Sequence, residues 1–441
     1  MKLVEHEYFG RGRVEKSRYG GFELYVEFED GIKRWVRINE VKPLPKDLAP
    51  QKDSSLKRTL SEEQFKARKV IDALRLGIVP YRYVEELTFG REKEVEAIMR
   101  WLSSPDSSSL VIIGEYGTGK SHLLEYIYSS ALRNNWAVSL IELDLNEVNF
   151  SRPKNIYRRL VLSLKFKEEK YDFREFLKQI AKSSRYHELN RHEYLGPAVN
   201  IIRLTGVVND EHFWRWIEGE KTPIYYGSPM PDYATCANIY CYIISGLGWA
   251  ARNILGLNGL LILFDEAENV DPYWFRSHRR CMVRNFLKGL VLMASNDPRL
   301  IKDVPTKSYG YLRPKGWWGD KTGLRYCGRI RLPFIWRTPS HVKLIFAFST
   351  DPYKIIDDQD VLLYLNDHVR LEHLNNEALM RILEKVVLLY REAYGFQPNS
   401  DFSDIVFKRI SSIGGKTRMF IKGVVEALDL MRFYPGKPLD P

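Results

Sequence analysis

Cysteine is scarce in this chain of 441 residues. The four cysteines are Cys236, Cys241, Cys281 and Cys327. They form no Cys-x-x-Cys pair, and no pair of histidines at metal-binding spacing accompanies them. We therefore expect neither a disulfide framework nor a zinc site, and we interpret the cysteines as small buried hydrophobic residues.

Long apolar runs are also lacking. No stretch is long enough to span a bilayer, and no charged-then-apolar segment with a cleavage site opens the chain. The 44% hydrophobic and 28% charged residues are typical of a globular protein and not of a disordered one. We expect a cytoplasmic protein of two or three domains with no membrane contact.

The most specific motif is an apolar run followed by Gly-x-x-x-x-Gly-Lys-Ser, residues 110–121, with a predicted helix from His122 to Arg133 directly after it. This strand, loop and helix order is that of a phosphate-binding P-loop. Its glycines let backbone N–H groups point at phosphate oxygens. Lys120 is expected to reach the β- and γ-phosphates of ATP, and Ser121 to offer its hydroxyl to Mg²⁺. The predicted nucleotide contacts are Gly114, Glu115, Tyr116, Gly117, Thr118, Gly119, Lys120, Ser121 and His122.

Two further apolar runs end in polar residues. Residues 259–264 lead into Asp265 and Glu266, a Walker B pattern in which Asp265 holds Mg²⁺ and Glu266 accepts a proton from the attacking water. Residues 342–348 lead into Ser349 and Thr350. We expect that strand to lie between the two Walker strands, where one of these hydroxyls contacts the attacking water.

Positive charge is concentrated in one segment. The net charge is +11, and residues 299–343 hold eleven Lys or Arg against two Asp, so +9 of the +11 lies there. Seven aromatic residues are interspersed between positions 305 and 339. Bases neutralise phosphates and exposed aromatics stack on nucleobases, so the segment favours single-stranded or distorted DNA. The alternative is a hairpin whose aromatics pack on the core. The predicted DNA contacts are Arg313, Lys315, Trp317, Trp318, Lys321, Arg325, Arg329 and Arg331.

The first 46 residues read as short strands joined by tight turns, which predicts a small barrel of the SH3 or Tudor kind. The arrangement His6-x-x-Phe9-Gly10-x-Gly12-x-Val14, followed by residues 26–31, resembles the small C-terminal module of UvrD/PcrA-type helicases. The resemblance implies docking to a protein such as a helicase or RNA polymerase. Prolines at 43, 45 and 50 mark a linker over residues 47–60.

Phe89-Gly90-Arg91-Glu92 resembles the N-terminal box of AAA+ ATPases of the initiator and STAND types. In that group the adjoining loop lines the adenine pocket, which implies base contact by Val79, Pro80 and Tyr81. Residues 413–422 resemble the entry to the lid domain of initiator-type AAA+ proteins. This resemblance implies that Arg418 contacts the γ-phosphate as sensor 2.

A wider resemblance joins these pieces. Segments 73–77, 89–92, 113–123, 156–158, 216–220 and 259–268 together resemble the ATP-binding proteins of BREX phage-defence systems, and Gly-Glu-Tyr-Gly-Thr-Gly-Lys-Ser-His is the most specific of them. The resemblance implies an AAA+-like ATPase that acts beside DNA-modifying or DNA-translocating partners. The N-terminal module departs from that family's pattern, which leaves a standalone relative paired with a helicase equally open.

Two weaker features stay open. Trp214 and Trp216 read as a packed helix face or a binding surface. Arg276, Arg279 and Arg280 lie on a predicted helix and read as a solvated face or as arginine fingers acting in trans, in which case the protein is a homo-oligomer.

The predicted fold is α/β: an AAA+, ASCE-type P-loop core at 61–372 with a basic aromatic insertion at about 303–341, a small helical lid at 373–441, and an all-β barrel before them. The predicted function is Mg²⁺-dependent ATP hydrolysis coupled to DNA, in phage defence or DNA processing. The alternative is a nucleotide-gated adaptor with little turnover that recruits a helicase or RNA polymerase.

Overall fold

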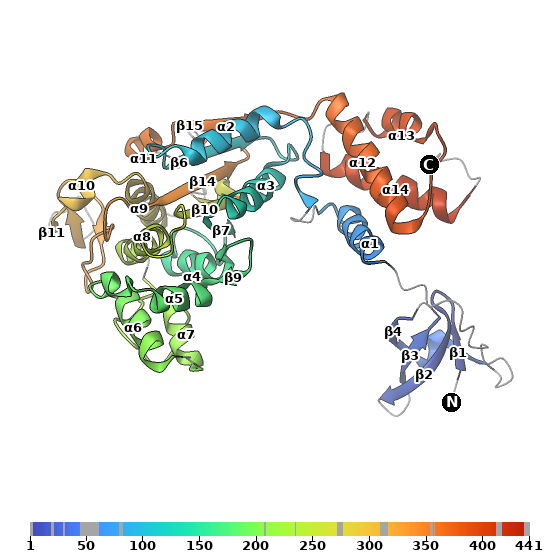
Figure 1. Cartoon of the computed structure of the whole chain (residues 1–441), viewed down its shortest axis with the longest axis horizontal. Coiled ribbons are helices and arrows are strands. Elements are labelled where there is room, and N and C mark those ends of the chain that lie inside the picture. Colours follow the sequence, from blue (N-terminus) through green and yellow to red (C-terminus); the bar gives the residue numbers. More distant parts are fainter. Residues whose placement is uncertain are drawn as a thin grey trace. The chain divides into compact units, whose positions relative to one another are not determined.

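The computed structural model describes residues 3–18, 22–29, 31–44, 61–78, 83–206, 209–233, 235–270, 277–308, 316–352, 356, 358–411 and 417–435. The chain divides into two compact units, residues 1–61 and 62–441 (Figure 1). The predictions for Val79, Pro80, Tyr81, Arg276, Arg313 and Lys315 lie outside the described residues.

The first unit is an antiparallel sheet in the order β4-β3-β2-β1-β5. Its strands are β1 (Leu3–His6), β2 (Gly10–Arg18), β3 (Glu23–Phe28), β4 (Lys33–Arg37) and β5 (Val41–Leu44), with a 3-10 turn η2 (Ile38–Glu40) before β5. Alternating residues bury a small core of Val4, Val26, Phe28, Val36 and Val41. The all-β character is confirmed, while the likeness to a Tudor or SH3 barrel stays a prediction.

The second unit is built on a seven-stranded sheet in the order β15-β6-β14-β10-β7-β8-β9. Its strands are β6 (Ser109–Gly114), β7 (Ala137–Glu142), β8 (Lys165–Phe166), β9 (Tyr171–Asp172), β10 (Leu260–Asp265), β14 (Val342–Phe348) and β15 (Asp367–Leu371). The five long strands pair in parallel, and the two-residue strands β8 and β9 extend one edge antiparallel. Strand β14 lies between the P-loop strand β6 and the Asp-Glu strand β10, as predicted.

Helices cover both faces of this sheet, which is why its central strands are apolar throughout. One face packs on α2 (Glu92–Ser103) and α3 (Lys120–Arg133). The other face forms a larger core with α4 (Pro153–Ser163), α8 (Ala237–Asn253) and α9 (Ser277–Ala294). The predicted P-loop fold class with a parallel sheet is confirmed.

The long connection between α4 and α8 is mostly helical. It contains α5 (Phe173–Lys182), η5 (Tyr186–Leu189), α6 (Leu195–Thr205) and α7 (Glu211–Ile217). Trp214 and Trp216 on α7 are both buried, so the packed helix face predicted as one alternative is the observed one.

The basic segment forms a small antiparallel sheet of β11 (Pro305–Ser308), β12 (Gly316–Gly319) and β13 (Arg325–Tyr326), preceded by α10 (Pro298–Ile301). The carboxylate of Asp303 ties the sheet together. It accepts hydrogen bonds from the Thr322 hydroxyl at 2.6 Å and from the Tyr326 hydroxyl at 2.8 Å.

The C-terminal helices are α12 (Asn376–Tyr394), α13 (Phe402–Ser411) and α14 (Thr417–Phe433), preceded by α11 (Gln359–Tyr364) and β15. They share one apolar core with α1 (Glu62–Arg75), through Val70, Ile71 and Leu74 of that helix. Arg75 of α1 forms an ion pair with Asp429 of α14 at 2.8 Å. The amino-terminal helix of this unit is therefore part of the packing of the helical lid.

Cys236, Cys241 and Cys327 are buried as expected, and the Sγ atoms of Cys236 and Cys327 lie 3.5 Å apart. Cys281 is exposed, so the expectation of burial is wrong for this residue. It lies on α9, where part of the helix surface faces solvent. Among the described helices none is long and apolar enough to cross a bilayer.

Candidate functional site

The Gly-x-x-x-x-Gly-Lys-Ser segment forms a turn between β6 and α3. Gly117 and Gly119 have positive φ angles of 92° and 96°, which L side chains rarely adopt. A Cβ on Gly114 would lie 2.6 Å from the Thr118 hydroxyl oxygen, so this glycine permits the close return of the loop. The helix begins at Lys120 and not at His122, because the loop residue Gly119 is its N-cap. The loop therefore has the backbone shape that directs N–H groups toward an anion.

The Lys120 side chain lies inside this turn. Its ammonium donates to the carbonyl oxygen of Gly114 at 2.9 Å and to that of Glu115 at 3.3 Å, and the residue is buried. Ser121 and Tyr116 are exposed. A compact positive charge held under a loop of backbone donors is suited to phosphate oxygens.

Arg91 fixes the loop from outside. Its guanidinium Nη2 donates to the carbonyl of Thr118 at 2.8 Å and to that of Glu372 at 2.6 Å, while Nη1 pairs with Glu94 at 2.9 Å. The sequence marked Arg91 only as part of a box, and its contact with the P-loop was not predicted. The buried arginine joins the P-loop to the segment between β15 and α12.

Among the described residues His122 contacts Thr88, the residue before this box, and no nucleotide-facing group. Its Nε2 lies 2.7 Å from the Thr88 hydroxyl, which itself donates to the Val84 carbonyl, so the imidazole is the donor. Burial and the nearby Arg91 lower the pKa of His122 to about 4. His122 is therefore neutral, and its bond to Thr88 helps to hold the start of the helix after the P-loop. Its role as a direct nucleotide contact stays a prediction.

The acidic residues lie where β10 ends. Glu266 has a φ of 52°, and its backbone N–H donates to Asp265 Oδ1 at 2.9 Å. Burial, Glu268 and Asp265 raise the pKa of Glu266 to about 7, and the positive charge of Lys120 opposes them. Lys120 and Glu266 are thus within electrostatic reach of each other.

Glu268 connects this cluster to the neighbouring strand. Its Oε2 accepts a hydrogen bond from the backbone N–H of Ser349 at 3.2 Å. Ser349 follows Phe348, which pairs with Ile113 beside the P-loop, and its side chain is half-buried while Thr350 is exposed. Glu268 is a site residue that we did not predict, although the pattern Asp-Glu-x-Glu places it on the same turn.

Mg²⁺ takes oxygen ligands and keeps several of its waters beside phosphates, so it needs few protein groups. Ser121 and Asp265 offer such oxygens, and the raised pKa of Glu266 indicates negative charge that a cation would offset. Among the described residues no group of three or more His, Cys, Asp or Glu forms a metal cage. The residues present fit a Mg²⁺ ion shared with phosphate and water.

Arg418 lies on the first turn of α14, and its Nε donates to the carbonyl of Gly77 at 3.1 Å. No contact between Arg418 and the P-loop occurs among the described residues. Arg279, one of the three candidate fingers, donates within its own chain to Ser151 and Leu145. The sensor role of Arg418 and a role in trans for Arg279 stay predictions.

The predicted DNA contacts that the structure describes fall into an exposed group and a half-buried group. Lys321, Arg329 and Arg331 are exposed, while Trp317, Trp318 and Arg325 are half-buried. The Arg331 guanidinium stacks over Trp317 at 4.1 Å.

Three other aromatics among the described residues of the segment pack inward. Tyr326 and Phe334 are buried, and Trp336 packs against the core. The alternative of aromatics packed on the core is therefore correct for these three and also for the half-buried Trp317, which packs against the same core. Phe334 lies against α9 and Trp336 against α8.

A comparison with protein families supports the identification of the P-loop. Residues 63–183 match the family model of the BREX system ATP-binding protein BrxC/D. No significant match was found among curated proteins.

Solved structures give looser matches. The chain is similar to Cdc6p from Pyrobaculum aerophilum, with 11% identity, a TM-score of 0.36, and coverage of 78% of this chain and 61% of that one. It is also similar to the Aeropyrum pernix ORC1 protein in complex with DNA, with 14% identity, a TM-score of 0.36, and coverage of 83% of this chain and 66% of that one. A third match is NtrX from Brucella abortus in complex with ADP, with 11% identity, a TM-score of 0.34, and coverage of 86% of this chain and 57% of that one. The chain spans about three fifths of the length of these proteins, and at such TM-scores the likeness carries no inference about function.

The family match includes both the Gly-Arg-Glu box and the P-loop, the two segments that Arg91 joins in space. Over residues 63–183 the chain therefore resembles the BREX ATP-binding proteins, and it does so at its nucleotide-binding motif.

Proposed function

We propose that the protein hydrolyses ATP with Mg²⁺ as cofactor. The observation that carries the proposal is the order of three strand ends: the P-loop after β6, Ser349 after β14 and the acids after β10 are neighbours along one edge of the sheet. In this proposal the residues for phosphate binding, water positioning and proton transfer come from segments up to 235 residues apart in sequence.

Each residue has a distinct part in this proposal. Lys120 and the loop N–H groups bind the β- and γ-phosphates, and Ser121 and Asp265 would hold Mg²⁺, which offsets the phosphate charge. Glu266 orients the attacking water and takes its proton. Glu268 positions this turn by its bond to the Ser349 N–H, which keeps the Ser349 hydroxyl near the water.

Steady-state ATP turnover tests the proposal. Glu266→Gln keeps the shape of the side chain but removes the base, so turnover should fall by about 10²-fold or more while ATP binding persists. Glu142→Gln is the matched control, because Glu142 is an exposed carboxylate paired in register with Asp265 on the next strand. Equal turnover by wild type and Glu266→Gln would refute hydrolysis at this site.

We propose further that turnover is coupled to DNA through the basic sheet. Helix α9 follows the acidic turn of β10, and its Asn285 exchanges two hydrogen bonds with the backbone of Arg325, at 2.6 and 3.0 Å. A movement of α9 would therefore be transmitted to β13. The exposed Lys321, Arg329 and Arg331 supply the charge that attracts the DNA backbone.

DNA binding by fluorescence polarisation tests this coupling at two salt concentrations, with single- and double-stranded oligonucleotides. The triple variant Lys321→Gln, Arg329→Gln, Arg331→Gln should weaken binding about tenfold or more and reduce the salt dependence. The control is a second triple variant that removes the same charge from exposed positions elsewhere and should have little effect on DNA binding: Arg100→Gln, Arg158→Gln, Lys182→Gln. A similar loss in both triples would indicate non-specific attraction only.

The second candidate is a nucleotide-gated adaptor whose N-terminal unit recruits a helicase or RNA polymerase. Exposed aromatics favour a docking role for this unit: Tyr8 is 83% and Phe22 72% exposed. ATP binding with negligible turnover, together with loss of partner binding in Tyr8→Ala, would favour the adaptor. Turnover that depends on Glu266 and rises with DNA would favour the enzyme, with phage defence or DNA processing as its setting.

A further inference from the structure

A polar cavity of about 700 Å³ lies beside the carboxyl end of β7, away from the P-loop. It is lined by Leu145, Asn146, Ser151, Arg152, Asp232, Arg279 and Met282. In the sheet, β14 and β10 separate β7 from the P-loop strand β6, so this cavity is distinct from the nucleotide site described above. Its size lies within the range of small-molecule sites.

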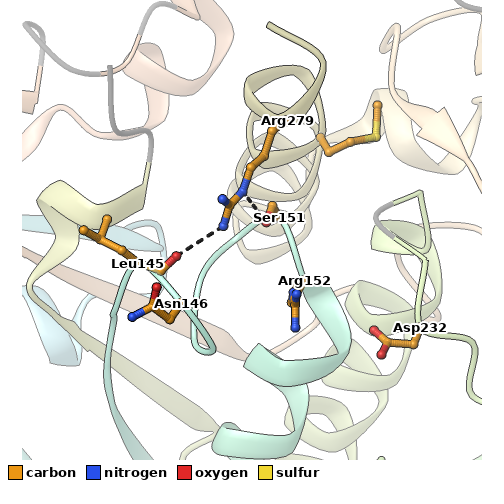
Figure 2. A pocket seen from close by; sticks show the side chains of 7 residues that line it. Leu145, Asn146, Ser151, Arg152, Asp232 and Arg279 are labelled. Atoms are coloured by element: carbon orange, nitrogen blue, oxygen red, sulfur yellow. Dashed lines mark hydrogen bonds between the residues drawn. The ribbon is translucent and has the colours of Figure 1, made fainter. Parts of the chain in front are cut away.

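Two guanidinium groups line the same cavity (Figure 2). Arg279 is held in place because its Nε donates to the Ser151 hydroxyl at 3.1 Å and its Nη2 to the Leu145 carbonyl at 3.2 Å. Arg152 is exposed and forms no ion pair among the described residues. Burial and the charge of Arg152 lower the pKa of Arg279, so the two cations repel each other. An anion between them would relieve this repulsion.

The other lining groups limit the kind of anion. Asp232 carries a negative charge and lies across the cavity from Arg279, so a ligand there must offer a hydrogen-bond donor as well as negative charge. Asn146 can donate and accept, and Leu145 and Met282 supply an apolar wall. Planar guanidinium groups favour phosphate, and a nucleoside combines hydroxyl and amino donors with a flat apolar face.

We propose that this cavity is a second site, which binds a nucleoside phosphate. The phosphate lies between Arg152 and Arg279, and the ribose or base donates to Asp232 and packs on Met282. The inference does not depend on ATP hydrolysis. The loop that forms one wall follows Leu143, whose N–H donates to the Asp265 carbonyl at 3.1 Å. A ligand in the cavity would therefore contact a loop that is hydrogen-bonded to the acidic turn.

The test uses the full chain carrying Lys120→Ala, which removes the lysine of the P-loop and leaves the cavity intact. Isothermal titration calorimetry with AMP, GMP, CMP, UMP and inorganic phosphate gives the affinities. We expect at least one nucleotide to bind more tightly than inorganic phosphate. Arg152→Gln should weaken that binding about tenfold or more, since a charge-assisted hydrogen bond is lost.

Arg158→Gln is the matched control, because Arg158 is exposed on α4, the helix that begins directly after Arg152, and does not line the cavity. It should leave the affinity within about twofold of the parent, and Asp232→Asn should change the ranking of the four nucleotides. Arg152 is exposed, so its replacement does not threaten folding. The absence of binding at millimolar nucleotide, an unchanged affinity in Arg152→Gln, or equal affinity for inorganic phosphate would each overturn the proposal.

Discussion

The guanidinium of Arg91 donates a hydrogen bond at 2.8 Å to the carbonyl oxygen of Thr118, in the middle of the P-loop. The same nitrogen reaches the Glu372 carbonyl at 2.6 Å, at the junction between the sheet and the lid helices. Arg91 is only 7% exposed, and its bond to Thr118 is shielded from water. The shape of the phosphate loop and the position of the lid junction thus depend on one side chain.

Replacement of Arg91 should therefore affect both stability and nucleotide binding. Arg91→Ala leaves the buried Thr118 carbonyl without its donor, removes the donor to the Glu372 carbonyl and leaves Glu94 without its ion pair, which together cost about 2–4 kcal/mol. We expect a lower melting temperature and a smaller further rise on adding Mg-ADP, both measured by differential scanning fluorimetry. Arg100→Ala removes an exposed arginine from α2 and should change neither value. An unaltered response to Mg-ADP in Arg91→Ala would contradict the proposed support of the loop.

Gly90, the residue before Arg91, should tolerate no side chain. Its φ is +66°, and a Cβ there would lie 2.7 Å from the Cβ of Ala378 on α12. Gly395 has nearly the same φ, +65°, but nothing lies within 4 Å of its hypothetical Cβ. Gly395→Ala should therefore cost only the backbone strain, about 1–2 kcal/mol. Gly90→Ala should cost at least about 1 kcal/mol more in urea unfolding, owing to the contact with α12. Equal losses would show that α12 yields to the added methyl group.

The pH dependence of stability should show the repulsion between Glu266 and the carboxylates beside it. Burial, Glu268 and Asp265 raise the pKa of Glu266 from its ordinary value of 4.5 to about 7. The folded chain then holds this proton more tightly than the unfolded chain does. The stability that protonation gives is fully present below about pH 4.5 and is lost as the pH rises through about 7.

Glu266→Gln cannot ionise, so its melting temperature relative to wild type should be higher at pH 8.5 than at pH 5.5. Since the group is partly solvated, we expect a difference of about 1–3 °C, measured in EDTA. Glu142→Gln at the same sheet edge is the control. A difference of the opposite sign would mean that the carboxylates do not repel each other in the folded chain.

Thiol labelling should distinguish the cysteines. Cys281 is exposed and the other three are buried, so native protein should react rapidly with Ellman's reagent at one thiol and denatured protein at four. Cys281→Ser should abolish the rapid phase, while Cys241→Ser should retain it. The hydrogen bond from Cys236 is the main reason that the pKa of Cys327 falls to about 6, but burial should still protect this thiolate from the reagent. Rapid labelling of Cys327 in the Cys281→Ser variant would contradict its burial.

Local patterns were sufficient for the central sheet. Strands β6, β10 and β14 could be recognised as short apolar runs that end in polar residues, because strands buried on both faces must be apolar throughout. The P-loop, the Asp-Glu pair and Ser349 lie at the ends of these strands. Helix α12 has local signals at both ends, since Asn375 caps it and Gly395 ends it with a left-handed conformation.

Contacts between distant segments could not be predicted in this way. Arg91 and Glu372 are 281 residues apart, and Ser349 and Glu268 are 81 apart. A basic aromatic segment can expose its rings or bury them, and only packing against α8 and α9 decided that Tyr326 and Phe334 are inside.

The sequence by itself determined the P-loop and its acidic partner strand, because residue type and spacing carry the chemistry of phosphate binding. The tertiary structure alone decided which polar groups support that site and which arginines share a second cavity. Burial and the distance between side chains arise only when the chain is folded.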